Sequence, residues 1–404
     1  MKSLDQVEPR IPIGPETTPG NSTAVFMITQ PGSYYLTQDI LASQNRNGLR
    51  IGLGDVTVDL NGFSIRSESD LTQNGVLISA SGPRAVRIRN GQIRDWGESG
   101  IQANIETTLL LEDLSISSNN AHGVLTQALT SGHFERCRAS DNALAGFSVE
   151  GEFVFDSCLA ESNTTGFAIN GPSTLTDCIA TNNLISGIEC QGTSVLRACV
   201  ATENGTGFVV PATGSTDTVR FVDCLARRNS NSGFVVQSAA HLTGCVSSGN
   251  SLSGFDATTS EVVVVNCTAR GNAQSGCRIF NGTRAHISGN HFDQNGSFGL
   301  FVTGSSSAAR ITKNSFVGNG NNGLRVDGDR ALIDGNSAEG NTGAEFAIRG
   351  FNSVVVRNTA FEQDTSGTGY SFLFPAENQI GPIHSSLGTI PASVSPWANF
   401  GQDL

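Results

Sequence analysis

A column of regularly spaced asparagines constrains the fold of this chain more than any other feature of its sequence. The column recurs with a period of about 20 to 26 residues, and self-similarity at such a period is the mark of a solenoid. Its members are Asn119, Asn142, Asn163, Asn183, Asn204, Asn229, Asn250, Asn272, Asn295, Asn319 and Asn341. Because a solenoid stacks one supersecondary unit on the next, the same side chain of each turn forms a column along the stack.

A second column stands five residues before the first. Its members are Leu114, Cys137, Cys158, Cys178, Cys199, Cys224, Cys245, Cys267, Asn290, Asn314 and Asn336. A glycine and an apolar residue follow most of the first-column asparagines, as in Gly146-Phe147 and Gly254-Phe255. After these glycines, inward and outward residues alternate with the period of a strand rather than of a helix. The repeat therefore predicts an all-β fold of short strands and tight bends.

Both columns have a structural explanation. An asparagine in a bend can bond its own backbone, and stacked amides can also bond from coil to coil. Stacked coils lie about 4.8 Å apart, but their Cβ vectors run parallel, which is poor geometry for a disulfide. No histidine or carboxylate joins the cysteines at the spacing of metal ligands. We therefore expect buried thiols that act as small apolar fillers.

The pattern resembles the right-handed parallel β-helix repeats of the pectate-lyase-like superfamily, from about Asn47 to Asn358. Residues 55–65 (DVTVDLNGFSI), 86–97 (VRIRNGQIRDWG) and 379–400 resemble the opening and closing segments of an uncharacterised subgroup of secreted bacterial proteins. Cysteine replaces asparagine through seven coils, a departure that affects packing more than fold. The resemblance implies a single-stranded right-handed parallel β-helix of about 14 coils with N- and C-terminal caps. It implies no established reaction.

The chain is expected to have three parts. Residues 1–30, rich in Pro, Gly and Thr, would cap the first coil, residues 31–358 would form the β-helix, and residues 359–404 would form a capping or covering tail. Such caps are needed because both ends of a solenoid expose strand edges. The first residues lack the apolar core of a signal peptide. The resemblance nevertheless implies a secreted, periplasmic or cell-surface protein.

The charge balance restricts the partner. With 24 Lys and Arg against 36 Asp and Glu, the net charge of −12 disfavours nucleic acid or an anionic membrane. No stretch of about 18 apolar residues predicts a membrane span. The resemblance implies a polysaccharide or oligosaccharide as the partner.

Outward positions of the strand after each glycine form one candidate surface. The residues singled out there are Glu189, Asp256, Arg278, Phe280, Phe301, Arg325 and Asp327. Aromatic faces with carboxylate and guanidinium hydrogen bonds grip sugar polymers. In a lyase, Asp256 or Asp327 would act as acid or base, and Arg278 and Arg325 would neutralise a uronate. The alternative is that Asp256 and Arg278 are an ordinary cross-strand pair on a solvated face.

A second candidate lies in the first full coils, at Arg87, Arg89 and Trp96. The arginines alternate outward on one strand and Trp96 would offer a stacking surface, so a carboxylated or sulfated sugar fits this spot. The alternative is structural, because an end coil needs arginines to bond orphan carbonyls and to hold a cap.

Metal and proton-transfer signals are weak. The aspartate-proline-histidine-glutamate motif of mannuronan epimerases and the paired aspartates of pectin hydrolases are absent. Asp327, Asp329 and Asp334 could bind Ca²⁺, but the glycine-rich nonapeptide repeat is missing, so no metal or other cofactor is assigned. The other proton carriers of the C-terminal coils are His286, His291 and Lys313.

The residues directly after the cysteines predict an apolar stripe. They are Leu159, Ile179, Val200, Leu225 and Val246, and each of the first four is followed by an alanine. If the alanines point inward, the stripe faces outward and needs a cover, either the C-terminal tail or a second copy of the chain. The alternative is that the strand parity flips and the alanines lie outside.

Two function classes stay open. The chain is either a carbohydrate-active enzyme, lyase-like or hydrolytic, or a non-catalytic scaffold, saccharide-binding or adhesion protein. The near-uniform period favours the second class, because enzymes on this fold usually build their clefts from long insertions. Between Gly100 and Gly323 the widest spacing of the repeat glycines is only 26 residues.

Overall fold

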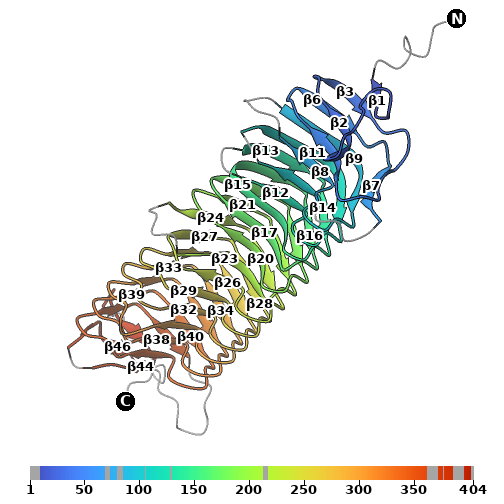
Figure 1. The fold of residues 1–404 in the computed structure, drawn as a ribbon. Coiled ribbons are helices and arrows are strands. Elements are labelled where there is room, and N and C mark those ends of the chain that lie inside the picture. The colour runs from blue at the N-terminus through green and yellow to red at the C-terminus, as the bar shows by residue number, and fades with distance from the viewer. Residues whose placement is uncertain are drawn as a thin grey trace, which may run out of the picture. The chain divides into compact units, whose positions relative to one another are not determined.

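The chain forms a parallel β-solenoid of about 15 turns, as the repeat predicts (Figure 1). The computed structural model describes residues 10–68, 73–79, 85–104, 106–127, 130–212, 217–361, 372–375, 377–384 and 395–401. Every regular element in these ranges is a β-strand. The chain divides into two compact units, residues 1–195 and 196–404.

In the 1–195 unit, each turn gives one strand to sheet B and two to sheet A. Sheet B contains β2 (Ala24–Ile28), β5 (Asn47–Ile51), β8 (Val76–Ile78), β10 (Ile101–Ala103), β12 (Val124–Thr126), β17 (Thr165–Asn170) and β20 (Ser186–Cys190). Sheet A contains β1 (Ile11–Pro12), β3 (Gly32–Tyr35), β4 (Ile40–Ala42), β6 (Val56–Asp59), β7 (Ser64–Ser67), β9 (Ala85–Arg94), β11 (Thr108–Ser117), β13 (Thr130–Glu135), β14 (Arg138–Ser140), β16 (Leu159–Glu161), β18 (Ser173–Thr176) and β19 (Ile179–Thr181). The long strand β15 (Ala145–Asp156) runs from sheet B into sheet A, and β21 (Val195–Arg197) begins at the last residue of this unit.

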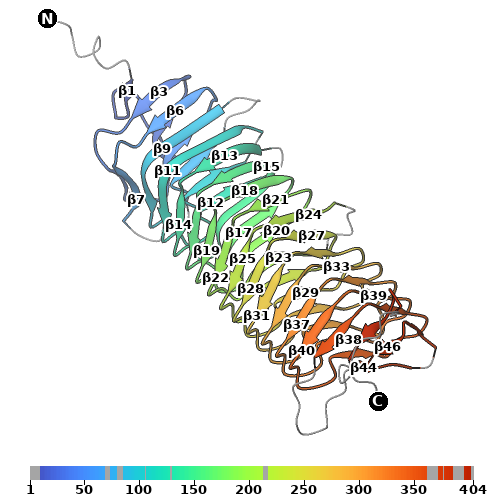
Figure 2. The same cartoon turned by 180° about the vertical axis from the view of Figure 1, so that it is seen from behind.

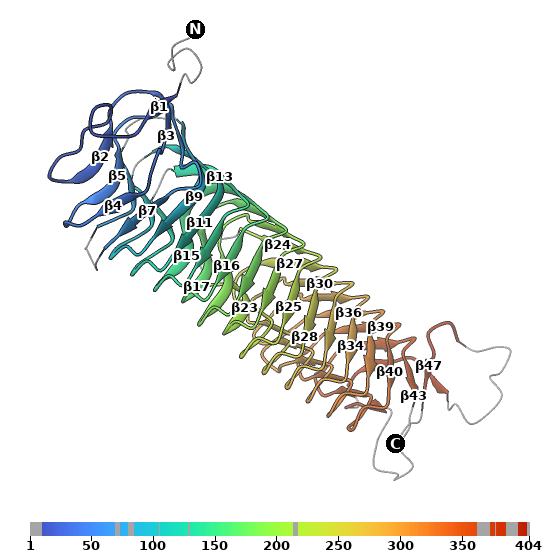
Figure 3. The same cartoon turned by 90° about the vertical axis from the view of Figure 1, so that its right-hand side faces the viewer.

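The 196–404 unit repeats the same plan. Its sheet B contains β23 (Thr206–Val210), β26 (Phe234–Val236), β29 (Phe255–Ala257), β32 (Cys277–Ile279), β35 (Leu300–Val302), β38 (Leu324–Val326), β41 (Phe346–Ile348) and β44 (Phe372–Leu373). One run of sheet A strands, stacked in Figure 3, contains β24 (Val219–Val222), β27 (Ala240–Thr243), β30 (Val263–Val265), β33 (His286–Ser288), β36 (Arg310–Thr312), β39 (Leu332–Asp334), β42 (Val354–Val356) and β45 (Gln379–Ile380). The other run, seen in Figure 2, contains β22 (Val200–Thr202), β25 (Leu225–Arg227), β28 (Val246–Ser248), β31 (Thr268–Arg270), β34 (His291–Asp293), β37 (Ser315–Val317), β40 (Ser337–Glu339), β43 (Thr359–Phe361), β46 (Ile383–His384) and β47 (Asn399–Phe400).

Left-handed residues make the bends between the strands. Asp223, with φ 54°, separates β24 from β25, and Arg228, with φ 52°, follows β25. The glycine before each sheet B strand is needed for a different reason. A Cβ atom on Gly254 would lie 2.6 Å from the Gly276 carbonyl oxygen and 2.9 Å from Asn272 Nδ2, so the coil above leaves no room for a side chain.

Stacked phenylalanines fill the interior. In the 196–404 unit the rings of Phe208 and Phe234 lie 4.7 Å apart and nearly parallel, and Phe255 continues the stack at 5.0 Å from Phe234. In the other unit, Phe147 stacks on Phe167 with centroids 5.1 Å apart. These rings all point inward because alternate residues of a strand face opposite sides.

The asparagine column is a ladder of buried amides in each unit. In the 1–195 unit, Nδ2 of Asn119 donates to Oδ1 of Asn142 at 2.8 Å, and the pattern continues to Asn163 and Asn183. In the other unit it runs from Asn204 to Asn341 over the predicted residues. The second-column asparagines form a further ladder, Asn290, Asn314 and Asn336, which extends to Asn358 and Asn399.

All nine cysteines are buried and present as thiols, as expected for apolar fillers. The Cys158 thiol, for example, donates a hydrogen bond to the Phe134 carbonyl oxygen, with 3.3 Å between Sγ and the oxygen. Burial raises the pKa of the Cys277 thiol, which keeps it protonated and unreactive.

The chain ends add strands to the stacks. At the start, β1 pairs with β3 and β2 with β5. At the other end, β44, β45 and β47 pair with β41, β42 and β43. The boundaries expected at residues 30 and 359 stay predictions. No helix in the described ranges is long and apolar enough to cross a membrane.

Candidate functional site

The predicted outward column of sheet B exists in the 196–404 unit. The strand registers place Val235, Asp256, Arg278, Phe301 and Arg325 opposite one another on consecutive coils. Each of these side chains is flanked on its strand by buried residues, so the column faces away from the core. The glycine-apolar signal thus placed four of the predicted site residues in one row.

Asp256 and Arg278 form a bidentate ion pair across neighbouring coils. Arg278 Nε donates to Asp256 Oδ1 at 3.0 Å, and Nη2 donates to Oδ2 at 2.8 Å. The aspartate side chain is 16% exposed and the arginine side chain 39% exposed. Two parallel hydrogen bonds fix both groups and neutralise both charges. This is the geometry of the cross-strand pair considered as the alternative from the sequence.

Arg325 is held in a similar way and also lies over two aromatic rings. Its Nε and Nη2 donate to Oδ1 and Oδ2 of Asp327 at 2.9 and 2.7 Å. Its Cζ lies 5.0 Å from the ring centroid of Phe301 and 5.6 Å from that of Phe298. The two rings are 4.9 Å apart. Cation–π attraction and the aspartate together fix the guanidinium against this aromatic pair.

A second outward position of sheet B carries Phe280 and Asp327. The Thr303 amide donates to the Ile279 carbonyl, and the Asp327 amide to the Val302 carbonyl, which aligns this row from coil to coil. Phe280 is 43% exposed. We call the following set the sheet B surface: Asp256, Arg278, Phe280, Phe298, Phe301, Arg325 and Asp327. Phe298 was missed from the sequence because it lies in the bend before β35 and outside the strand period.

The two carboxylates of this surface stand far apart along the stack. Asp327 lies on the same coil as Arg325, and this coil is three register steps along the stack from the coil of Asp256. At about 4.8 Å a step this is about 14 Å, whereas paired catalytic carboxylates of glycosidases lie about 5 to 10 Å apart. The sheet B surface therefore offers two separate ion pairs rather than one carboxylate pair.

The repeat region of the chain matches a known protein family. The family model described as right handed beta helix region matches residues 36–194 and 210–361. The chain belongs to the right-handed β-helix family. This confirms the resemblance to folds of the pectate-lyase-like type.

Three solved structures are similar to this β-helix at low sequence identity. The A-module of the Azotobacter vinelandii mannuronan C-5 epimerase AlgE6 is 16% identical, with 83% of this chain and 92% of that chain covered and a TM-score of 0.45. The periplasmic alginate epimerase AlgG is 10% identical, with 85% of this chain and 86% of that chain covered and a TM-score of 0.42. The tailspike protein gp49 of Acinetobacter baumannii bacteriophage Fri1, a capsular polysaccharide depolymerase, is 11% identical. The match covers 70% of this chain and 53% of that chain, with a TM-score of 0.35. No curated protein matches this chain.

Glu189 belongs to the other unit of the β-helix, on β20. Its register partner is Ala168, so it faces outward as predicted. Partial burial raises the pKa of its carboxyl group. No cation among the described residues pairs with it, so its role as a substrate-binding residue stays a prediction.

The first-coil arginines hold structural carboxylates. Arg89 Nη2 and Arg10 Nη1 both lie 3.1 Å from Oδ2 of the buried Asp59. Arg87 lies 3.8 Å from Glu112. These contacts join strands β6, β9 and β11, and the role of Arg87 and Arg89 as substrate-binding residues stays a prediction.

Trp96 offers no surface to a ligand, which corrects the expectation from the sequence. Its side chain is 1% exposed, and its indole Nε1 donates to the Ile65 carbonyl oxygen at 3.2 Å. The physical reason is the residue before it. Asp95 adopts a left-handed conformation with φ 64°, which turns the next side chain into the core.

The three aspartates considered for Ca²⁺ are not brought together. Asp327 pairs with Arg325, Asp334 pairs with Arg357, and Asp329 Oδ1 accepts the Phe351 amide at 2.8 Å. Within the ranges given above, no group of three or more His, Cys, Asp or Glu side chains is placed to hold a metal ion.

The aliphatic stripe lies outside, as the parity of the strands predicts. In the 1–195 unit Leu159 is in register with Ile179, and in the 196–404 unit Val200, Leu225 and Val246 are in register. The alanines that follow the first four residues are buried. Ile179 is 41% and Val246 37% exposed. A second copy of the chain as the cover stays a prediction.

A shallow groove in the 1–195 unit was not predicted. Its volume is about 530 Å³, and its lining is Ser118, Asn119, Asn120, Asp141, Asn142, Ala143, Ser162, Asn163, Thr164 and Leu184. The residues before three ladder asparagines, Ser118, Asp141 and Ser162, adopt left-handed conformations and line this groove. Its lining offers hydroxyl and amide groups and the Asp141 carboxyl.

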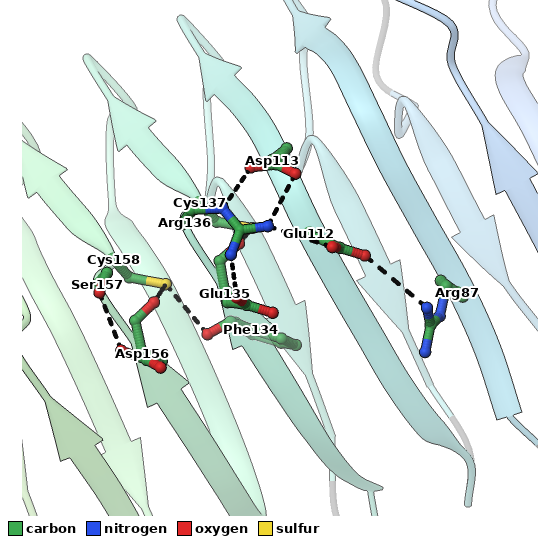
Figure 4. A network of polar contacts seen from close by, with 10 residues as sticks. All are labelled: Arg87, Glu112, Asp113, Phe134, Glu135, Arg136, Cys137, Asp156, Ser157 and Cys158. Atoms are coloured by element: carbon green, nitrogen blue, oxygen red, sulfur yellow. Dashed lines mark hydrogen bonds and ion pairs between the residues drawn. The ribbon is translucent and has the colours of Figure 1, made fainter.

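A polar network of the 1–195 unit centres on Arg136 (Figure 4). Arg136 Nε and Nη2 donate to the two Asp113 oxygens at 2.7 and 3.0 Å, and Nη2 also reaches Glu112 at 3.2 Å. Glu135 pairs with the same guanidinium. The hydrogen bond from Arg136 lowers the pKa of Asp113. Because these side chains are solvated and the Arg136 guanidinium is shared among three carboxylates, the network fixes a surface rather than forming a site.

Proposed function

We propose that this β-helix binds an extracellular polysaccharide through its sheet B surface. The observation that carries the proposal is Arg325, which lies over Phe301 and Phe298 while Asp327 fixes its guanidinium. A flat aromatic and guanidinium face thus stands beside carboxylate oxygens in a fixed orientation.

Sugar rings match such a surface. One face of a pyranose consists of C–H groups that pack on an aromatic ring, and its hydroxyls donate to carboxylates. Phe280 and the Phe298–Phe301 pair are the stacking groups, and Asp256 and Asp327 are the acceptors. Because these groups lie on successive coils about 4.8 Å apart, an extended polymer along the stack contacts several of them.

The geometry favours binding over turnover. A lyase needs a free base and an uncompensated cation to neutralise the uronate carboxylate. Here Asp256 and Arg278 already satisfy each other, and so do Asp327 and Arg325. Hydrolysis by two carboxylates is disfavoured by their separation. We therefore propose a saccharide-binding or adhesion role at the cell surface, in the periplasm or in the medium.

The test compares exposed phenylalanines. Wild-type protein would be titrated by calorimetry with a panel of neutral and acidic polysaccharides, beside Phe301→Ala, Phe280→Ala and Phe351→Ala. Phe351 is 48% exposed in the same unit but lies outside the sheet B surface, so Phe351→Ala is the matched control. We expect binding that falls about tenfold or more in the first two variants and is unchanged in the control.

Two results would contradict this function. Absence of binding to every polymer would remove it, and so would equal binding by Phe301→Ala and wild type. The same samples would be assayed for ultraviolet absorbance of an unsaturated uronate and for new reducing ends. Either product would replace the binding role with a lyase or a hydrolase.

A further inference from the structure

A row of basic side chains, two arginines and two histidines, runs along sheet A of the 196–404 unit, on a different set of strands from the sheet B surface. Strand β24 places Arg220 opposite His241 of β27, and β33 places His286 opposite Arg310 of β36. Val263 of β30 stands between the two pairs, opposite His241 on one side and His286 on the other. The five residues thus occupy one position on five consecutive coils.

The row is accessible. Arg220, His241 and Arg310 are exposed, His286 is half-buried, and the strand neighbours Phe221, Leu242, Ile287 and Ile311 are buried. The side chains of the row therefore face away from the core, and the strands behind them are fixed by the core packing. A ligand would meet the cations in a preformed line.

The two arginines of the row differ from many others in this unit. Six arginines of the unit form ion pairs with carboxylates, namely Arg228, Arg270, Arg278, Arg284, Arg325 and Arg357. In the described part of the chain no carboxylate forms an ion pair with Arg220 or Arg310. Two uncompensated guanidinium groups and two imidazoles in line are unexpected in a chain with a net charge of −12.

We propose that this row, Arg220, His241, His286 and Arg310, binds a single strand of an acidic polysaccharide. Four register steps separate Arg220 from Arg310, so the row is about 19 Å long and one side chain wide. A linear polymer with an anionic group on each repeat can place its carboxylates or sulfates at both cation pairs at once. Val263 offers an apolar contact between them.

The dimensions and the charge favour a polysaccharide over nucleic acid. A duplex presents two phosphate strands to a broad basic face, whereas this row is a single file. The remainder of the chain is acidic, which repels a polymer of higher charge density. The site does not depend on the sheet B surface, because none of its residues is shared.

The imidazoles make the binding sensitive to pH. Burial and the neighbouring Arg220 lower the pKa of His241, and its other neighbouring strand, β30, faces it with Val263 and Val265. Arg310 is the charged group facing His286 across β36. The nearby Glu261 carboxylate is paired with Arg284. An anion on the row favours the protonated form of the His241 imidazole, so affinity rises as pH falls.

The experiment uses the full chain and three defined polymers. Polygalacturonate supplies carboxylates, dextran sulfate supplies sulfates, and dextran is the neutral counterpart. Affinity electrophoresis would be run at about pH 5 and about pH 7.5, on the two sides of the ordinary titration range of an imidazole. The variants are Arg220→Gln with Arg310→Gln, His241→Gln with His286→Gln, and Arg228→Gln. The last removes one surface arginine of the same unit outside the row.

We expect binding of at least one acidic polymer but not of dextran. The double arginine variant should lose about tenfold or more in affinity, and Arg228→Gln less than about twofold. The double histidine variant should lose most of the pH dependence. The same differences between the row variants should remain in a Phe301→Ala background, which separates this site from the sheet B surface because the two share no residue.

Several outcomes would overturn the proposal. The row is not the site if the double arginine variant binds as wild type, or if Arg228→Gln loses as much as the double variant. Dextran binding equal to that of the acidic polymers would show that charge is not recognised. Tighter binding of duplex DNA than of either acidic polymer would replace the polysaccharide by nucleic acid. Circular dichroism of each variant would separate loss of binding from loss of fold.

Discussion

Asn341 ends the amide ladder of the 196–404 unit at the carboxylate of Glu345. The Asn341 backbone N–H donates to Glu345 Oε1 at 3.2 Å, and its Nδ2 donates to Oε2. Glu345 is only 3% exposed. The earlier ladder asparagines of this unit donate to the amide oxygen of the next asparagine, whereas Asn341 donates to a buried carboxyl group. A column of neutral groups thus ends at a titratable one.

Glu345 should make the stability of the chain depend on pH. Burial raises the pKa of its carboxyl group from 4.5 to about 7, despite the opposing hydrogen bonds from Asn341. The folded chain therefore holds a proton that the unfolded chain loses, and stability falls as pH rises from about 4.5 to about 7. The loss should reach about 3 kcal/mol. Glu345→Gln should remove most of this slope in urea unfolding at pH values across that window.

The matched comparison for this effect is Glu377→Gln, which changes an exposed glutamate of the same unit that does not contribute to the pKa shift of Glu345. That variant should keep the wild-type pH slope. Parallel slopes for wild type and Glu345→Gln would show that the buried acid does not carry the effect.

Removal of one amide from the ladder should be costly. Asn229 Oδ1 accepts the Asn204 backbone N–H at 2.9 Å, and its Nδ2 donates to Asn250 Oδ1 at 2.9 Å and to the Ala201 carbonyl at 3.2 Å. Asn229→Ala would leave these buried groups unpaired, and we expect a loss of about 2 to 4 kcal/mol. Asn231→Ala, at an exposed position of the same bend, should change stability little. Equal unfolding midpoints for the two variants would rule out an energetic role for the ladder.

The repeat made the fold predictable because each column has one physical cause. Asn229 and its equivalents must bond from coil to coil, and Gly254 must let the next coil approach, so both residue types recur at the period of the turn. The end of the second ladder was not predicted. Asn399 follows Asn358 in this ladder but is 41 residues away in sequence, whereas the other ladder spacings follow the period of the repeat.

For the candidate site, the sequence could predict which side chains face outward on each strand, but not how those side chains pair. Alternation placed Asp256 and Arg278 outward and in register, but bidentate pairing depends on side-chain rotamers that no pattern encodes. Trp96 shows where alternation fails. One left-handed residue, Asp95, shifts the parity and sends the indole into the core. The cation row was missed because its members recur on the strand before the cysteine column, where no conspicuous motif marks the period.

Two phenylalanines of the 196–404 unit should separate stability from binding. Phe234 is buried between Phe208 and Phe255, so Phe234→Ala leaves a cavity and should cost about 3 to 5 kcal/mol. Phe280→Ala should change the free energy of unfolding by about 0.5 kcal/mol or less, because its ring is 43% exposed. Chemical denaturation of both variants would check this. A large loss of stability in Phe280→Ala would mean that its ring packs within the fold and is not available to a ligand.

The cysteine thiols should not react with a thiol reagent while the chain is folded. All nine cysteines are buried, and disulfide exchange with a reagent such as dithionitrobenzoate needs an accessible thiolate. We expect no rapid labelling of the native protein at mildly alkaline pH and labelling of all nine thiols in denaturant. Ser230→Cys, which adds a thiol at an exposed bend, should react at once and confirm that the reagent reaches the surface. Rapid native labelling of the wild-type chain would show that the coils open around the cysteine positions, because no thiol is accessible while the coils stay stacked.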